Sequence, residues 1–223
     1  MARRVGPVER ATAVPRPSPE AGPRRSLAGV DGADLPPDFA PFAGEAAAAT
    51  HFVTVCCNDA LPAAVDRELA ALKRSGRPAA EVAREGVSLI ERTLDAGHGE
   101  CPLRREVAVD AVMRGLTKYH HTRYRLHAAV VMPNHAHLLL RPDGPVEAVV
   151  RRIHSSTAKR VCDVVHAAVP LWRDLVIHRP VRDAEHLRRS LRYLGRNAER
   201  LPGDPDAVRW LRGDWERCGW GFG

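Results

Sequence analysis

Two histidines separated by one residue, His135 and His137, lie in a short apolar run with the pattern of a β-strand. Successive side chains of a strand point to opposite faces, so both imidazoles would project from one face of a sheet while Ala136 points to the other. Two neighbouring imidazoles supply half of a metal site, and a hard cation would need additional oxygen ligands. An exposed or hydrogen-bonded histidine pair is the alternative, which the motif alone does not exclude.

A second group of polar residues follows at helical spacing. A helix beginning at Asp183, a good N-cap residue, would bury a row of leucines and run to Asn197. Tyr193 and Asn197 are four residues apart, so they would lie one turn apart on the same surface. A nucleophile and an oxygen ligand could thus face one metal. Alternatively, Tyr193 packs its ring at the edge of the core and donates its hydroxyl to water.

The elements that must position these residues alternate between strands and helices. We expect strands at 51–57, 124–132, 135–140 and 171–179, and helices at 61–96 (broken at 76–78), 106–119, 146–168 and 183–197. Pro133 and Asn134 suit a tight connection between the two middle strands. This order predicts an α+β fold of the ferredoxin-like (RRM-like) type, with an antiparallel sheet and helices on one face. Its βαββαβ-type order would be followed by a C-terminal catalytic helix.

The composition divides the chain into two parts. Residues 1–48 are rich in Pro, Gly, Ala and Arg and have no apolar periodicity, so we expect a disordered arm without a catalytic role. Residues 49–223 are expected to form a single domain, because the chain of 223 residues with 44% hydrophobic residues can bury one core. No internal repeat is visible.

The positive charge is concentrated in one part of the sequence. The formal net charge is +7, and the window 151–200 holds 12 Lys or Arg against five Asp or Glu, which leaves 22 of each sign elsewhere. Such a concentration is expected of a face that meets phosphates. The alternative for each residue is a solvated helix face. The candidate phosphate contacts are Arg151, Arg152, Lys159, Arg160, Arg189 and Arg192.

Other compositional features bear on the compartment. The five cysteines are odd in number and form no C-x-x-C pair, so we expect reduced thiols. The longest apolar runs fall short of the roughly 20 residues that a membrane span needs. We therefore expect a cytoplasmic protein, associated with the bacterial nucleoid and not with a membrane.

Three segments resemble a known family. Residues 130–140, VVMPNHAHLLL, resemble the signature of the REP-associated tyrosine transposases, within the single-tyrosine HUH transposase superfamily. Residues 99–104, GECPLR, and the Tyr193-Leu194-x-x-Asn197 segment are similar to the family in order and separation, and the resemblance covers residues 50–200.

The chain also departs from the family pattern at three places. Ala198 stands where the family usually has proline, and His154 stands where it often has lysine. The segment 173–176, after Trp172, also differs from the family. These differences concern DNA specificity and leave the residues for the chemistry in place.

The resemblance implies a mechanism. It implies that His135 and His137 bind a divalent cation, Mg²⁺ or Mn²⁺, that Asn197 completes the metal site, and that Tyr193 attacks DNA. The products would be a 5′-phosphotyrosine and a free 3′-hydroxyl, so no nucleotide cofactor is needed. The substrate would be single-stranded DNA with hairpin (REP-like) elements. The sequence thus predicts a metal-dependent transposase or nickase that cleaves and rejoins DNA.

Two other functions remain open at this stage. One is a catalytically silent, domesticated DNA-binding protein of the same fold, to which the altered segment after Trp172 points. The other is a metal hydrolase in which water is the nucleophile. A monomer and a homodimer are both compatible with the sequence, because some members of the superfamily exchange the tyrosine helix between subunits.

Overall fold

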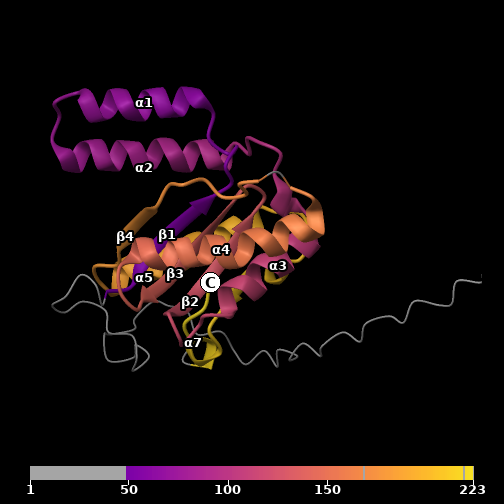
Figure 1. The fold of residues 1–223 in the computed structure, drawn as a ribbon. Helices are drawn as coiled ribbons and strands as arrows, with labels where there is room; N and C mark the ends of the chain where they lie inside the picture. Colours follow the sequence, from indigo (N-terminus) through magenta and orange to yellow (C-terminus); the bar gives the residue numbers. More distant parts are fainter. Residues whose placement is uncertain (1–48, 168, 218, 223) are drawn as a thin grey trace, which may run out of the picture.

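The computed structural model describes residues 49–167, 169–217 and 219–222, and the arm expected at 1–48 lies outside them. Five strands form one antiparallel sheet in the order β4-β1-β3-β2-β5 (Figure 1). The strands are β1 (His51–Cys56), β2 (Tyr124–Met132), β3 (His135–Pro142), β4 (Ile177–Pro180) and β5 (Arg209–Leu211). The helices are α1 (Ala63–Arg74), α2 (Ala79–Asp95), η3 (Pro102–Arg104), α3 (Glu106–Thr117), α4 (Val146–Val165), α5 (Ala184–Glu199), α6 (Pro205–Val208) and α7 (Gly213–Arg217).

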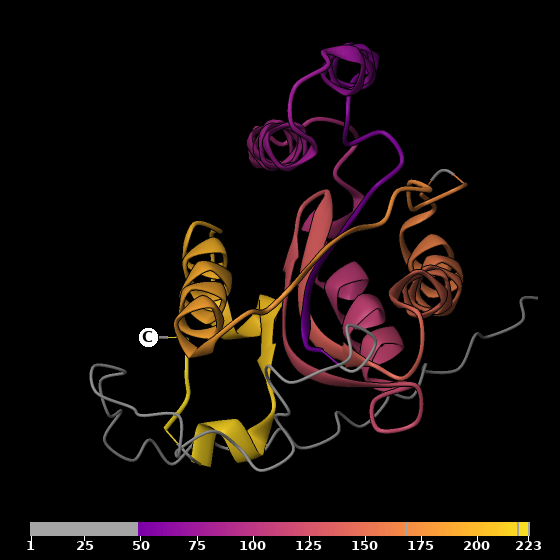
Figure 2. The ribbon, with the colours of Figure 1, turned by 90° about the vertical axis from the view of Figure 1, so that its left-hand side faces the viewer.

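The antiparallel sheet packed with helices confirms the predicted α+β class, although helices cover both faces of the sheet and not only the one face expected. Helices α3 and α4 lie on one face, and α5, the additional C-terminal helix, covers the other (Figure 2). Alternate residues of each strand enter the two cores: Val53 joins the core under α3 and α4, whereas Phe52 joins the core under α5. Because both faces are covered, β2 and β3 are buried almost throughout.

The central hairpin has the predicted connection. Pro133 and Asn134 join β2 to β3, and Met132 pairs with His135 across the turn. On its other side, β3 pairs with β1 in a register that sets Thr54 opposite His137. The histidine strand is therefore the centre of the sheet.

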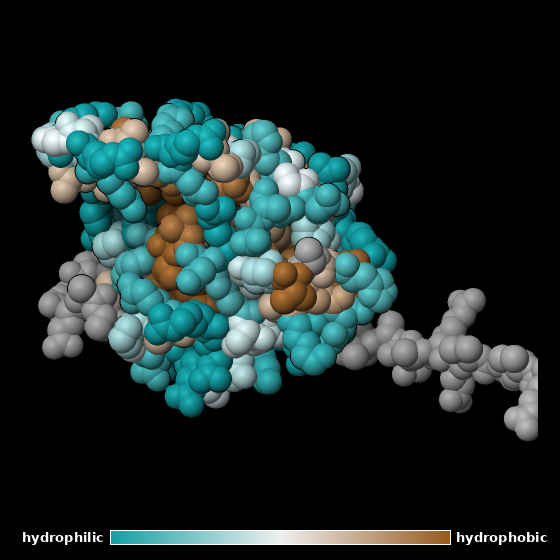
Figure 3. All heavy atoms as spheres, turned by 45° about the horizontal axis from the view of Figure 1, so that its top comes forward, coloured by the Kyte–Doolittle hydropathy of each residue, from teal (hydrophilic) through white to brown (hydrophobic). Residues whose placement is uncertain are grey.

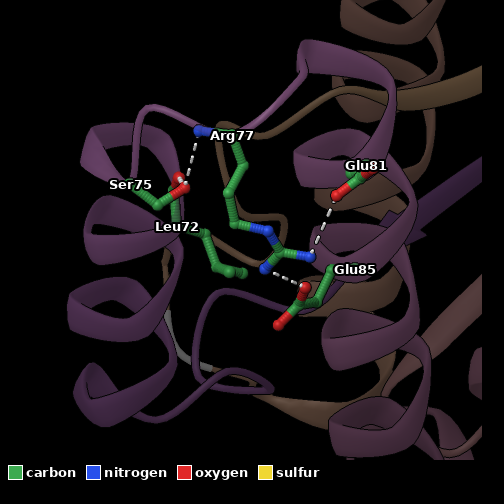
Figure 4. Close-up of polar contacts among 5 residues, drawn as sticks. All are labelled: Leu72, Ser75, Arg77, Glu81 and Glu85. Atoms are coloured by element: carbon green, nitrogen blue, oxygen red, sulfur yellow. Dashed lines mark hydrogen bonds and ion pairs between the residues drawn. The ribbon is translucent and has the colours of Figure 1, made fainter.

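Helices α1 and α2 form a hairpin that projects beyond the sheet (Figure 1). The predicted break at 76–78 is present: Arg77 in the connection forms ion pairs with Glu81 and Glu85 of α2 (Figure 4). In the same connection, Ser75 Oγ donates a hydrogen bond to the Leu72 carbonyl oxygen and accepts one from the Arg77 backbone N–H. Figure 3 shows mostly hydrophilic side chains on the hairpin and a hydrophobic patch on the surface directly below it.

Two parts of the fold differ from the expected elements. The strand expected at 171–179 is reduced to β4 and an isolated bridge between Trp172 and Cys57. The Trp172 indole N–H donates to Thr157 Oγ1 at 2.7 Å, so the side chain of Trp172 is held against α4 while its backbone only bridges the end of β1. The short elements after α5 were not predicted, although β5 extends the sheet by pairing with β2. Among the described residues, no helix has both the length and the apolar character needed to cross a membrane.

Candidate active site

His135 and His137 project from the same face of β3, toward α5. Their Nε2 atoms are 3.1 Å apart, and each side chain is 1% exposed. The His137 ring contacts the rings of Phe52 on β1 and Tyr193 on α5, at centroid distances of 5.3 and 5.2 Å. The period of the strand thus brings both imidazoles into the core that α5 covers.

The other ring nitrogen of each histidine has a fixed partner. Asn134 donates from Nδ2 to the His98 carbonyl oxygen at 2.9 Å, which leaves its Oδ1 to accept from His135 Nδ1 at 2.8 Å. Neutral His135 therefore keeps its lone pair on Nε2. His137 Nδ1 lies 2.9 Å from Thr54 Oγ1, and a hydroxyl satisfies either tautomer because it can donate or accept. Partners of this kind orient the histidines of metal sites.

Burial keeps both imidazoles neutral. Desolvation lowers the pKa of His135 to about 3. Burial also lowers the pKa of His137 well below its ordinary value, and the neighbouring His135 and Arg179 lower it further. Neutral imidazole is the form that binds metals.

Tyr193 of α5 packs against the histidine pair of the same chain. Its hydroxyl oxygen is 3.4 Å from His137 Nε2, and its ring meets Phe52 edge-on at 5.8 Å. Helix α5 begins as predicted, because the Asp183 side chain accepts a hydrogen bond from the His186 backbone N–H at 2.6 Å. Three leucines of α5 are fully buried under the helix, and they fix which side of α5 faces β3: Leu187, Leu191 and Leu194.

The Tyr193 phenol is protonated in this environment. Burial is the largest effect and raises its pKa, and the nearby charges of Glu91 and Asp95 on α2 raise it further. A hydrogen bond from Asn197 and the charge of Arg179 act in the opposite direction. The hydroxyl must therefore lose its proton as it attacks a substrate.

Asn197 contributes an oxygen atom that needs a partner. Its side chain is 1% exposed, and Nδ2 donates to the Tyr193 carbonyl oxygen at 3.1 Å. Its Oδ1 is buried and has no hydrogen-bond partner in the part of the chain that the structure describes. Leaving a buried acceptor unpaired costs about 1–3 kcal/mol. A cation that takes oxygen ligands would remove this cost.

His135, His137 and Asn197 offer donor atoms of the types that a metal site uses. No cluster of three or more His, Cys, Asp or Glu side chains suited to a metal occurs among the described residues. The donor set of two imidazole nitrogens and one amide oxygen suits a divalent cation that also takes oxygen from water or phosphate. His135, His137 and Asn197 are therefore the candidate ligands.

The six candidate phosphate contacts fall into two separate groups. Arg189 and Arg192 lie on α5, on the side of the sheet that carries the histidines. The other four lie on α4, on the opposite face: Arg151, Arg152, Lys159 and Arg160. One α5 pocket is lined by Tyr193, Asn197 and four arginines, of which Arg196 and Arg200 were not among the six.

Sequence reasoning missed the residues that hold the site together. Thr54 and Phe52 come from β1, far from the histidines in sequence, and only the β1–β3 pairing brings them close. Arg179 on β4 lies over the Phe52 ring at 4.8 Å and forms an ion pair with Glu91 at 3.4 Å. Asn134 was assigned only to the turn, although a polar residue beside an H-x-H pair could have signalled a partner for His135.

Comparisons with known proteins give little beyond this geometry. No protein-family model matches the chain, and no curated protein is significantly similar to it. A solved structure of a REP-associated tyrosine transposase bound to a REP hairpin is similar over 68% of this chain and 67% of that one. The sequence identity is 14% and the TM-score is 0.37, so the site itself must carry any argument about function.

Proposed function

We propose that this chain cuts and rejoins single-stranded DNA, with Tyr193 as the nucleophile. The observation that carries the proposal is the position of the Tyr193 hydroxyl, 3.4 Å from Nε2 of His137, which is itself 3.1 Å from Nε2 of His135. A tyrosine that is merely packed at the edge of the core does not require a buried imidazole of a histidine pair beside its hydroxyl. The four arginines that line a pocket with Tyr193 and Asn197 support a polyanionic substrate.

The proposed reaction is a transesterification. The Tyr193 oxygen forms a bond to the phosphorus of a phosphodiester, and the bond from phosphorus to the 3′ oxygen breaks. The proton of the phenol ends on that 3′ oxygen, which leaves a 5′-phosphotyrosine and a free 3′-hydroxyl. The ester bond is conserved, so the reverse reaction joins strands without a nucleotide cofactor.

The proposed metal site would contain His135, His137 and Asn197. A bound Mg²⁺ or Mn²⁺ would polarise a non-bridging phosphate oxygen and stabilise the charge that develops there. Asn134 and Thr54 hold the two imidazoles in place, and α5 buries them away from water. We further propose that the DNA carries hairpin (REP-like) elements, as the resemblance of residues 130–140 to the REP-associated transposases implies.

The experiment is an adduct assay. Purified protein is incubated with hairpin-containing single-stranded DNA, labelled at its 3′ end, and with Mg²⁺ or Mn²⁺. The proposal predicts a labelled species that survives SDS, that is absent with EDTA, and that is absent from the Tyr193→Phe variant. The same adduct in Tyr193→Phe would refute the assignment of the nucleophile, and cleavage without any adduct would indicate a water nucleophile.

A catalytically silent DNA-binding protein is the second candidate. The segment that departs from the transposase pattern is tied into the fold, since Arg173 forms an ion pair with Asp66 at 2.6 Å and Trp172 bonds to Thr157. This candidate predicts hairpin binding that is insensitive to EDTA and to His135→Ala, with no cleavage.

A further inference from the structure

Four exposed arginines form a row along α5 beside the nucleophile. They lie at positions i, i+3, i+7 and i+11, which is the spacing of one helical stripe. At a rise of about 1.5 Å per residue, the row is about 16 Å long. The four arginines line one pocket together with Tyr193 and Asn197: Arg189, Arg192, Arg196 and Arg200.

Half of this row has no carboxylate partner in the part of the chain that the structure describes. Among the described residues, neither Arg189 nor Arg196 forms an ion pair, whereas Arg192 pairs with Glu185 at 3.2 Å. Arg200 pairs with Asp95 at 3.3 Å, and Asp95 is the last residue of α2. A solvated helix face typically carries charges of alternating sign, whereas this stripe carries arginine at all four positions.

We infer that this row, which is named here the arginine row, binds successive phosphates of the single strand that Tyr193 attacks. The inference rests on the proposed function and specifies where the reacting strand lies. Tyr193 lines the same pocket as Arg192 and Arg196, so a strand that follows the row passes beside Tyr193. Guanidinium groups bind phosphate oxygens in a bidentate manner, which gives such a strand a defined register.

At its Arg200 end, the arginine row contacts helix α2 through Asp95. Figure 2 shows the α1–α2 hairpin above α5 and the sheet, and the charges of Glu91 and Asp95 reach the Tyr193 hydroxyl. A phosphate that approaches Arg200 meets the negative charge of the Asp95 carboxylate paired with it. Asp95 therefore weakens binding of the strand at this end.

A strand only as long as the arginine row, about 16 Å, cannot contact the basic residues of α4 as well. The two helices cover opposite faces of the sheet. A short unstructured oligonucleotide that lies along α5 cannot pass the sheet to reach α4. This separation allows the inference to be tested with a strand of about four nucleotides, which is long enough to follow the row of about 16 Å and too short to reach round to α4.

The experiment measures binding without cleavage. Fluorescence anisotropy of a labelled, unstructured four-nucleotide strand is recorded for the Tyr193→Phe protein over a range of salt concentrations. In this background, Arg189→Ala and Arg196→Ala are each expected to weaken binding several-fold and to reduce the slope of log K against log salt by about 0.7. The control is Arg67→Ala on α1, which removes another exposed arginine and is expected to change neither quantity.

A variant at Asp95 should change the affinity for the strand in the opposite direction. Asp95→Asn frees Arg200 and is expected to tighten binding two-fold or more. Glu85→Gln removes one charge from an ion pair at the far end of the same helix (Figure 4), so it should leave binding unchanged. Melting temperatures of all variants identify any that are destabilised.

The outcomes separate this inference from the proposed function. The arginine row would be refuted if Arg196→Ala changed neither the affinity nor the salt slope, or if Arg67→Ala lowered the affinity as much as Arg196→Ala. Equal effects of Asp95→Asn and Glu85→Gln on the affinity would also refute it. If the adduct forms on the wild-type protein in that case, the nucleophile assignment still holds. Conversely, binding that depends on the row without any adduct would retain the row and refute the catalytic proposal.

Discussion

Asn134 Oδ1 accepts a hydrogen bond from Nδ1 of His135 at 2.8 Å, within the two-residue turn that joins β2 to β3. The same asparagine donates to the His98 carbonyl oxygen, so its amide orientation is defined on both sides. One turn residue thus links the connection after α2 to a candidate metal ligand. It also determines that the lone pair of neutral His135 lies on Nε2, which faces His137 and not the backbone.

Asn134→Ala is therefore expected to weaken metal binding. Loss of a hydrogen-bond partner behind a metal-binding histidine typically lowers affinity 10- to 100-fold. Titration calorimetry with Mn²⁺ would measure this change. The control is Thr54→Ser, which keeps a hydroxyl beside His137 and should retain most of the affinity. Equal Mn²⁺ affinity in Asn134→Ala and the wild type would show that Asn134 serves only the turn.

Asn197 offers a test in which stability and metal binding move in opposite directions. Asn197→Leu removes the buried Oδ1 that has no partner among the described residues, so the metal-free protein should unfold at the same or a slightly higher urea concentration. The same variant removes a proposed ligand, so the stabilisation by added Mn²⁺ should largely disappear. A loss of metal-free stability together with full Mn²⁺ stabilisation would argue for a structural role.

The buried histidines predict acid sensitivity of the metal-free protein. The pKa of His135 falls from its ordinary 6.5 to about 3 in the folded state, so below pH 6.5 the unfolded chain binds a proton that the folded chain does not. Stability is therefore full above pH 6.5 and declines as the pH falls toward 3, by about 1.4 kcal/mol per pH unit for each such histidine. Urea unfolding in EDTA between pH 7.5 and 4.5 should show a shallower decline in His135→Gln. An identical decline in both proteins would contradict this role of burial.

The α4 residues should matter only for larger DNA. Arg160→Ala is expected to leave the affinity for a short unstructured strand unchanged and to lower the affinity for a hairpin-containing strand that extends beyond the site. The reason is that α4 and α5 lie on opposite faces of the sheet. Anisotropy with the two oligonucleotides measures both affinities. A loss of affinity for the short strand would contradict the separation of the two basic groups.

Local patterns predicted the parts of the site that lie close together in sequence. Strand period put His135 and His137 on one face, Pro133 and Asn134 formed the expected connection, and Asp183 caps the helix that carries Tyr193. Each of these three predictions uses only residues that are close together in sequence, and the repeat of one strand or one helix. The predicted class of fold followed from the order of such elements.

The long-range parts could not be predicted in the same way. Thr54 meets His137 because of the β1–β3 register, and no local pattern specifies which residues pair across strands. The basic residues were grouped by sequence position, whereas α4 and α5 cover opposite faces. The strand β5 is only three residues long, and its pairing with β2 depends on a C-terminal segment without a periodic pattern.

The most direct test of the central claim is the site of covalent attachment. The chain has three tyrosines: Tyr119, Tyr124 and Tyr193. Tyr124 is buried and donates to the Leu116 carbonyl oxygen, so the protein contains a tyrosine that cannot reach DNA. Digestion of the SDS-stable adduct with nuclease and protease, followed by mass spectrometry, should find the nucleotide on Tyr193 alone. Attachment to Tyr119, or to any residue other than Tyr193, would contradict the account.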